Sequence, residues 1–385
     1  MKDWSSSAWT AGFLAVLISY AGPLLILVQA AQQGNLPAEM LASWVWAVSL
    51  GAAGSSILLS WYLKVPIVTA WSAPGSALLL GLLPEVSMPE VVGAYLTAAL
   101  LTVVIGLSGY FDRVVNAIPR EVAAGMMAGI LFQFGTQAFR ASDELPGVVF
   151  AMLLAYLLGR RFCARHAVLM VALTGFLTSV SLGHVSLGVL DLVPAKPVFT
   201  WPVFNLETFL GLALPLLLVS FTGQYLPGIA VVRLAGYSVP SRAVVAGTGA
   251  ASLLTACFGG ISTVPAAITA TLCTGKDAHP NPGKRYVAGI ATGVFYLVGG
   301  TFAGTIVFAL SALPSALVSA LAGVALIGAI VANIRASVQN GACAEVSIIT
   351  FLATASGMSI WGLGSAFWGV LFGLISYWML GRPQA

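Results

Sequence analysis

Two short stretches, residues 65–81 and 258–275, place hydroxyl-bearing residues, proline and glycine inside apolar sequence. Each opens with β-branched or glycine-rich residues, meets Pro74 or Pro265, and continues as small residues that favour a helix. Proline and glycine break the hydrogen-bond ladder of a helix, which a membrane tolerates only within protein or beside a polar cavity. Paired interrupted segments in the two halves of a transporter mark its binding site. We therefore predict the site here.

The two stretches contain no Asp or Glu, which bears on the charge of the ligand. If helices begin after the two prolines, over residues 75–80 and 266–272, inverted halves aim both helix N-termini at one point. Unpaired backbone N–H groups at such a point attract an anion, and a nearby carboxylate would repel it. Cation-coupled and proton-relay transporters usually place carboxylates there. The pattern predicts an anionic ligand; the alternative is that both prolines only kink packed helices.

Neutral polar and aromatic residues supply the other candidates. Gln224 is either a hydrogen-bond partner of the ligand or a link between helices. The aromatic rings either form a pocket for a flat apolar ligand or serve in packing and interface anchoring. We expect the ligand's negative charge between residues 72–75 and 263–266, with hydrogen bonds from Ser72, Thr263 and Gln224. The candidate binding residues are Tyr20, Thr69, Trp71, Ser72, Ala73, Pro74, Gly75, Gln224, Tyr225, Ser262, Thr263, Val264 and Pro265.

Motifs for other chemistry are missing from the sequence. The Gly275-Lys276 pair lacks the upstream glycine and the following Ser or Thr of a phosphate-binding loop. Neither a metal cluster nor a nucleophile–base arrangement is visible. We expect no enzyme activity, no catalytic residue, no metal and no other cofactor.

The composition identifies the elements that must position this site. Of the 385 residues, 59% are hydrophobic and 7% are charged, against about 25% charged in a typical soluble domain. Apolar runs of nearly 20 residues recur, so the chain is predicted to be an all-α polytopic membrane protein. Its net charge of +4 therefore concerns orientation and does not suggest nucleic-acid binding. Fourteen apolar segments are expected, at roughly 10–33, 38–62, 65–82, 89–109, 114–138, 146–162, 166–183, 206–230, 241–257, 260–274, 285–310, 314–334, 342–358 and 361–380.

Proline motifs indicate an internal duplication. Ser72-Ala73-Pro74 is echoed by Thr263-Val264-Pro265, and similar pairs recur at offsets of about 190–205 residues. Seven spans per half is an odd number, so the halves must enter the membrane with opposite orientation, as in many secondary transporters. We predict a first inverted repeat over residues 1–189, a polar, proline-containing connecting loop over 190–205, and a second repeat over 206–385.

Lysine and arginine set the predicted orientation. With the N-terminus in the cytoplasm, all of the 16 basic residues except Arg140 and Lys196 fall on the inner side. Both termini are then cytoplasmic.

At these residues the chain resembles the BenE-type benzoate/proton symporters of bacterial inner membranes. The resemblance runs over nearly the whole length. It is carried by residues 65–72 (VPIVTAWS), Gln224 with 227–230 (PGIA), 266–270 (AAITA), 278–280 (AHP) with Arg285-Tyr286, and 364–369 (GSAFWG).

The resemblance implies a relative of the nucleobase and sulfate transporters. It implies a core of spans 1–4 and 8–11, a gate of spans 5–7 and 12–14, and a site between spans 3 and 10. It further implies a homodimer that joins through the gate. Ala73 and Tyr225 depart from the family pattern, in which Thr and Asn are frequent at these positions.

Three functions follow as hypotheses. The first is proton-coupled import of an aromatic carboxylate such as benzoate across the inner membrane. The second is an uncoupled uniporter or channel-like permease for small inorganic or organic anions, and the third is a membrane scaffold without transport. The proton is expected on the substrate carboxyl, or on Glu121, Glu345 or a histidine.

Overall fold

The computed structural model describes residues 5–21, 23–83, 85–162, 167–184, 192–339, 343–361 and 363–380. Lys2, Arg165 and Arg382, three of the basic residues used for orientation, lie outside the described residues, as do residues 190 and 191 of the predicted connection. The described part is mostly helical, as predicted. Five of its helices are long and apolar enough to cross a membrane, or up to seven if each of two bent helix pairs forms one span.

The first half of the chain contains ten helices or helical turns and one strand among the described residues. In order they are α1 (Ser6–Ala21), α2 (Pro23–Gln33), α3 (Ala38–Leu63), β1 (Thr69–Trp71), α4 (Ala73–Leu82), α5 (Met88–Ser108), α6 (Phe111–Ala117), α7 (Arg120–Arg140), η1 (Ala141–Asp143), α8 (Pro146–Phe162) and α9 (Ala167–Ser181).

The second half has more breaks. Its described elements are α10 (Leu206–Thr208), η3 (Phe209–Ala213), α11 (Leu214–Ser220), η4 (Phe221–Tyr225), α12 (Leu226–Leu234), α13 (Ser241–Ala256), β2 (Thr263–Pro265), α14 (Ala270–Thr274), η5 (Pro282–Lys284), α15 (Tyr286–Thr301), α16 (Ala303–Ser311), α17 (Ser315–Val338), α18 (Ala344–Ala355), β3 (Ser359–Ile360), β4 (Leu363–Gly364) and α19 (Ser365–Leu380).

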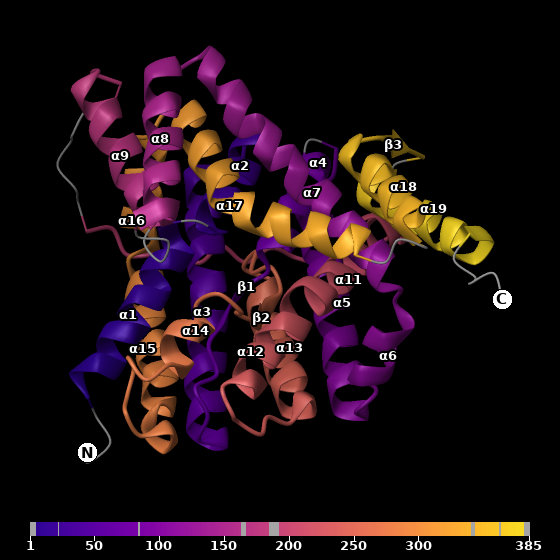
Figure 1. The fold of residues 1–385 in the computed structure, drawn as a ribbon, viewed down its shortest axis with the longest axis horizontal. Coiled ribbons are helices and arrows are strands. Elements are labelled where there is room, and N and C mark those ends of the chain that lie inside the picture. The colour runs from indigo at the N-terminus through magenta and orange to yellow at the C-terminus, as the bar shows by residue number, and fades with distance from the viewer. Residues whose placement is uncertain are drawn as a thin grey trace.

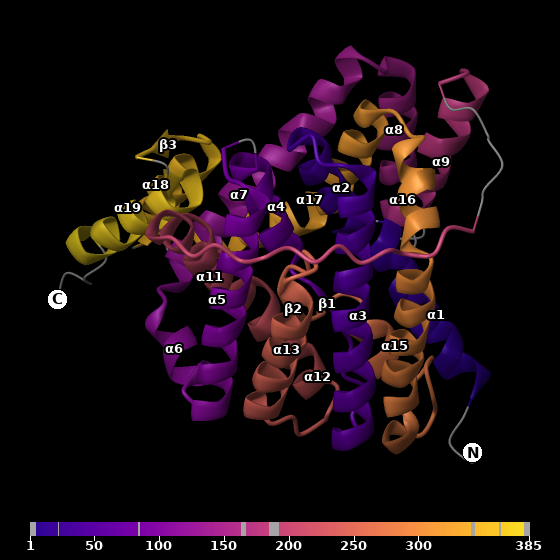
Figure 2. The same ribbon diagram turned by 180° about the vertical axis from the view of Figure 1, so that it is seen from behind.

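The helices form two groups that lie one above the other in Figures 1 and 2. In the lower group α3 packs on α15, α5 on α13, and α1 on α15. In the upper group α7 packs on α17 and α18, and α8 on α9. Each group mixes elements from both halves of the chain. This mixing is compatible with an internal duplication whose halves interdigitate.

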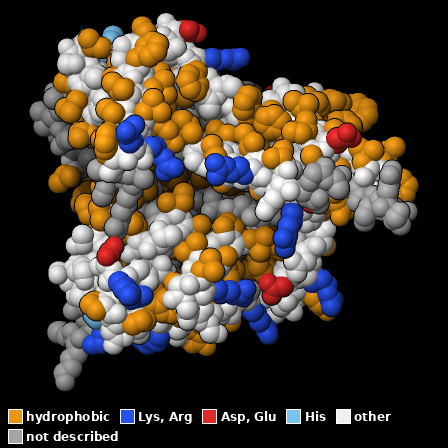
Figure 3. All heavy atoms as spheres, in the orientation of Figure 1, with side chains coloured by type: hydrophobic (Ala, Val, Ile, Leu, Met, Phe, Trp, Pro, Cys, Tyr) orange, Lys and Arg blue, Asp and Glu red, His pale blue; other side chains and the backbone are white. Residues whose placement is uncertain are grey.

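Two short strands from opposite halves of the chain meet at the junction of these groups. β1 pairs with β2 in antiparallel fashion, with Ala70 opposite Val264 and Trp71 opposite Thr263. Both strands are fully buried. Figure 3 shows a recess between the upper and lower groups on the face that also displays β1 and β2 in Figure 1, with Lys and Arg side chains around it.

The segment of residues 192–205 is irregular and crosses the back of the molecule (Figure 2). Backbone N–H groups attach it to helix ends: Ala195 donates to Thr301 at 2.9 Å, Thr200 to Cys257 at 2.8 Å. This segment was predicted to be polar, but its exposed surface is largely apolar, so that prediction is wrong. It exposes a row of large apolar side chains, which are Leu192, Val193, Phe199, Trp201, Val203 and Phe204.

Two wide helical turns precede prolines in the first long helix of the second half. η3 and η4 are π-helical, and each is followed by one leucine and then a proline, Pro215 or Pro227. A proline ring clashes with the carbonyl four residues before it, which here belongs to Gly211 or Gly223. The preceding turn widens to relieve the clash, and such π turns are frequent at functional sites.

Candidate functional site

The crossing of β1 and β2 forms the centre of the candidate site. Beyond the paired residues, the Ser72 N–H donates to the Ser262 carbonyl at 2.9 Å, and the Ala266 N–H donates to the Val68 carbonyl at 2.9 Å. The two predicted stretches are therefore bound to each other along their backbones. Most of their backbone groups are satisfied without water, as the interior of a membrane protein requires.

A serine of the preceding helix anchors each strand. In the first half the Thr69 N–H donates to Ser56 Oγ of α3 at 3.0 Å. In the second half the Thr263 N–H donates to Ser252 Oγ of α13 at 2.8 Å. The same device thus anchors the first residue of each strand, one strand in each half of the chain.

Helix α4 begins directly after β1 and is capped. Ser72 is its N-cap, and Ser72 Oγ accepts the Gly75 N–H at 3.1 Å and a hydrogen bond from Ser220 Oγ at 3.1 Å. Pro74 has no N–H, and the Gly75 N–H is bound to Ser72. The Ala73 N–H is therefore the backbone donor in the first turn of α4 that a ligand can still use. The predicted helix over residues 75–80 lies within α4. Its N-terminus is positive and favours an anion.

The helix predicted over residues 266–272 is wrong in its bounds. After Pro265 the Ala266 N–H is bound to the Val68 carbonyl just before β1, residues 267–269 form a bend and a turn, and α14 begins only at Ala270. The first residue after β2 that can serve as an N-cap is Thr269, whereas Ser72 follows β1 immediately. Since α14 has only five residues, its dipole is small, and the two-dipole argument holds for α4 alone.

Residues 266–269 offer backbone donors in place of a second helix terminus. The N–H groups of Ala267, Ile268 and Thr269 form no hydrogen bond within the part of the chain that the structure describes. Ile268 is exposed, so this turn is reachable, while the Thr269 hydroxyl is buried and has no partner among the described residues. Consecutive free N–H groups can bind an anion.

Gln224 lies in the π-helical turn η4, between the two groups of helices. Its side chain is half-buried, and its amide has no hydrogen-bond partner among the described residues. The neighbouring Gly223 packs on Met127 of α7, where an added Cβ would come within 2.7 Å of the Met127 methyl group. On the other side Gly228 packs on Pro265, where an added Cβ would lie 2.7 Å from the Pro265 Cβ. Gln224 therefore stands in a turn packed between α7 and β2, and its amide is available to a ligand.

Several of the other predicted side chains pack against neighbouring helices. Opposed residues of an antiparallel pair share a face, so Thr69, Trp71 and Thr263 lie on one face of the strand pair. The Thr69 hydroxyl donates to the Ala52 carbonyl at 2.9 Å. The Thr263 hydroxyl has no partner among the described residues and lies 2.5 Å from where a Cβ on Gly51 would be. The expected hydrogen bond from Thr263 to a ligand is not available in this arrangement.

The aromatic candidates form packing contacts and hydrogen bonds around the two strands. Tyr20 shares a hydrogen bond of 2.6 Å with Ser49, and its ring lies 5.9 Å from that of Trp71. Tyr225 shares a hydrogen bond of 2.7 Å with Thr248 and donates to the Thr263 carbonyl at 3.3 Å. These contacts favour the packing alternative for all three rings in the described arrangement.

Sequence reasoning missed several residues that hold the site. Ser220 and Ser252 bind Ser72 and Thr263 directly, and Tyr296 of α15 closes the aromatic cluster, with its ring 6.0 Å from that of Trp71. Ser220 lies four residues before Gln224, on the same face of the helix, and this spacing could have identified it. Nothing in the sequence pattern points to Ser252 or Tyr296.

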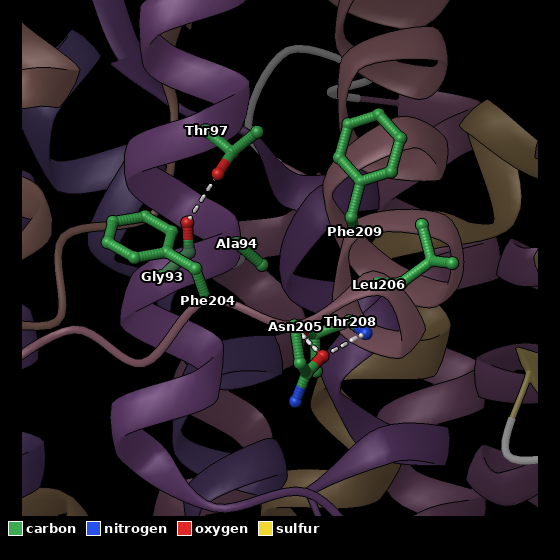
Figure 4. Close-up of a pocket in the computed structure, with 8 residues that line it drawn as sticks. All are labelled: Gly93, Ala94, Thr97, Phe204, Asn205, Leu206, Thr208 and Phe209. Atoms are coloured by element: carbon green, nitrogen blue, oxygen red, sulfur yellow. Dashed lines mark hydrogen bonds between the residues drawn. The ribbon is translucent and has the colours of Figure 1, made fainter.

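Two cavities are found outside the predicted residues. The larger, of about 340 Å³, lies between α5 and residues 204–209 (Figure 4). The smaller, of about 50 Å³, lies along α4 between Ala77, Gln133 and Met358. Among the described residues, no group of three or more His, Cys, Asp or Glu could hold a metal ion.

The comparison with protein families decides the class of the protein. The model of the BenE family, described as benzoate membrane transport protein, matches residues 2–379. The chain belongs to this family. Members are membrane transport proteins, so the expectation that the chain is not an enzyme is confirmed. The resemblance inferred from the motifs is confirmed as well.

Two curated relatives match nearly end to end. The "Benzoate membrane transport protein" of Acinetobacter baylyi (strain ATCC 33305 / BD413 / ADP1) is 53% identical over 384 residues, which cover 100% of this chain and 98% of the relative. The "Inner membrane protein YdcO" of Escherichia coli (strain K12) is 36% identical over 370 residues, 96% of this chain and 95% of the relative.

Solved structures share the fold of this BenE-family chain. Murine Slc26a9, an anion transporter in the inward-facing state, matches with a TM-score of 0.68 at 15% identity over 99% of this chain and 69% of its own. A second SLC26A9 structure matches with a TM-score of 0.65 at 14% identity over 97% of this chain. The chain spans 65% of that longer protein. The transmembrane domain of the cyanobacterial bicarbonate transporter BicA matches with a TM-score of 0.61 at 15% identity, over 96% of both chains.

Proposed function

We propose that this BenE-family protein is a secondary active transporter that imports an aromatic carboxylate, benzoate or a similar acid, together with protons. The family and the 53% identical benzoate membrane transport protein support the substrate class. The observation that carries the proposal is the neutral centre of the site. β1, α4, η4, β2 and α14, all described in the structure, contain no Asp or Glu, so nothing there repels a carboxylate.

The proposed binding mode uses the two sides of the strand crossing differently. The carboxylate lies at the start of α4, near Ser72, Ala73, Pro74 and Gly75, and is attracted by the Ala73 N–H and the dipole of α4. The free N–H groups of residues 267–269 lie at the other end of the strand pair, since Ala266 is bound to Val68 and Ser72 to Ser262, and are proposed to contact the far part of the ligand. The Gln224 amide adds a directed hydrogen bond, which contributes about 0.5–1.5 kcal/mol. Ser262, Val264 and Pro265 form the backbone wall beside it.

The proposed topology has fourteen spans as two inverted repeats, residues 1–189 and 206–385, with both termini in the cytoplasm of the inner membrane. The core would consist of spans 1–4 and 8–11 and the gate of spans 5–7 and 12–14, with homodimers formed through the gate. Labelling of cysteines introduced at Lys196 and Arg285 should place these positions on opposite sides of the membrane. Finding both on one side would contradict the repeat.

Proton coupling is proposed to use the substrate carboxyl itself, because the described elements of the strand crossing contain no Asp or Glu. Glu121 and Glu345 lie in the first turns of α7 and α18, which are not among the elements of this crossing. Glu121→Gln and Glu345→Gln should therefore leave proton-driven uptake intact in proteoliposomes. If either variant lost proton-driven uptake but kept substrate exchange, the proton would be carried by that glutamate.

The second candidate function is an uncoupled uniporter or channel-like permease for small anions, which would use the same neutral centre. Uptake of labelled benzoate into proteoliposomes, with and without an inward proton gradient, separates the two. Accumulation that needs the gradient supports the symporter, and equilibration that ignores it supports the uniporter. Protein-free liposomes are the control, and no uptake above this control would contradict both functions.

A further inference from the structure

The groove between α5 and residues 204–209 has the properties of a binding site for an apolar chain. Its volume of about 340 Å³ is within the range of small-molecule sites. Figure 4 shows Phe204 on one side and Phe209 with Leu206 on the other, above the backbone of α5 at Gly93 and Ala94. Gly93 lets the segment lie directly on the helix, because a Cβ there would come within 2.0 Å of the Val203 carbonyl oxygen.

The polar side chains of this groove are already satisfied. Thr97 donates to the Gly93 carbonyl at 2.8 Å, and Asn205 Oδ1 accepts the Thr208 N–H at 2.7 Å (Figure 4). Asn205 Nδ2 donates to the carboxylate of Glu90 at 2.7 Å. None of the eight lining residues is charged. A ligand therefore gains apolar contact here and no new hydrogen bond or ion pair from the lining.

The charges nearby exclude the transported acid as the occupant. Glu90 lies one turn before Gly93 on α5, and Glu207 is exposed between Leu206 and Thr208, which both line the groove. Both carboxylates repel an anion, and the lining offers no cation to offset them. The same carboxylates attract an ammonium group at this end of the groove.

The groove continues into a surface suited to lipid. Further along the same face of α5, Leu100, Val104 and Leu107 are each more than half exposed. At its other end are the exposed rings of Phe204 and Trp201 on the crossing segment. Aromatic rings of this kind are typical of the membrane–water interface.

We propose that this groove binds one acyl chain of a phosphatidylethanolamine, with the lipid ammonium group at Glu90 and Glu207. The acyl chain lies over Gly93, Ala94 and Thr97 between Phe204 and Phe209. The lipid would thereby hold the connecting segment against α5. The site is separate from the strand crossing, so its existence does not depend on the proposed transport activity.

Native mass spectrometry of the purified protein tests this site, with phosphatidylethanolamine and phosphatidylglycerol of the same acyl chains added separately. Thr97→Trp fills the groove and should lower retention of phosphatidylethanolamine about tenfold, since excluding even two methylene groups costs that much. Leu154→Trp places the same ring on the exposed surface of α8, outside the groove and its continuation along α5, and is the matched control. Phe204→Ala removes an exposed wall without filling the groove and should also reduce retention.

The expected result is that the wild type and Leu154→Trp retain phosphatidylethanolamine in preference to phosphatidylglycerol, whereas Thr97→Trp and Phe204→Ala do not. Three results would overturn the proposal. They are wild-type retention by both groove variants, equal retention of the two lipids by the wild type, and displacement of the bound lipid by benzoate.

Discussion

The two strands that cross at the centre of this protein begin alike and end differently. A helix serine anchors each one, Ser56 for β1 and Ser252 for β2. β1 then passes directly into a capped helix of ten residues, whereas β2 passes into an open turn and a helix of five residues. Ser72 caps the start of α4 with its side chain, whereas Thr269 before α14 makes no side-chain cap hydrogen bond.

Because of this difference, the two sides of the site, the start of α4 and the turn after β2, have different roles in binding. The first side supplies a fixed helix N-terminus, whose dipole and Ala73 N–H are oriented before the ligand arrives. The second side supplies the N–H groups of residues 267–269 and the Gln224 amide, which have no partners among the described residues. We expect the first side to give charge attraction, and the second to adjust to the ligand.

The largest expected effect comes from a negative charge on the second side. Gln224→Glu keeps the size of the side chain but places a carboxylate beside the bound anion. Two like charges at about 4 Å repel by roughly 4 kcal/mol in a partly desolvated site, or about a thousandfold in affinity. Uptake of labelled benzoate should fall to background, while the exposed Gln33→Glu variant should transport normally. Wild-type uptake by a well-expressed Gln224→Glu protein would place the anion elsewhere.

Adding a methyl group at Gly228 or at Gly75 should lower the free energy of unfolding by different amounts. Gly228→Ala presses a Cβ against the Pro265 backbone, 2.9 Å from its carbonyl oxygen, and backbone cannot rotate away. In Gly75→Ala the nearest atom is the flexible end of Leu216. Gly228→Ala should cost about 1–3 kcal/mol and Gly75→Ala less, measured by thermal unfolding in detergent. The reverse order would mean that β2 yields more easily than α4.

Removing one hydroxyl from each side should give the smallest effects. Ser72→Ala deletes the cap of α4 and should cost about 0.5–2 kcal/mol of helix stability, with weaker benzoate binding. Thr269→Ala deletes a hydroxyl that makes no cap hydrogen bond and should change stability little. Thermal unfolding and equilibrium binding of benzoate to both variants would measure this. Equal losses in the two variants would mean that Thr269 also caps its helix.

The sequence located the strand crossing because proline, glycine and hydroxyl residues inside apolar sequence have few other uses. It also indicated α4, since Ser72 and Pro74 are a recognisable helix start. It failed after Pro265, where residues 266–272 favour a helix on their own. There the hydrogen bond from Ala266 to Val68 keeps Ala266 out of a helix, and no local pattern reveals a bond to a residue so distant in sequence.

The orientation of the side chains could not be predicted from the sequence either. Thr263 and Ser72 look equivalent in the sequence, but the register of β1 and β2 turns Thr263 toward Gly51, whereas Ser72 Oγ faces Ser220. Register depends on the pairing of two segments, and a shift of one residue would reverse every side chain.

Photolabelling with an azido-substituted benzoate, mapped by mass spectrometry of the membrane-embedded protein, tests the account most directly. We predict labels within residues 72–75, 224–227 and 266–269 that excess benzoate removes, because the carboxylate anchors the reactive ring between α4 and η4. Gln224→Glu should lose these labels. Benzoate-protected labelling confined to the groove at residues 204–209, or to α17–α19, would contradict the account.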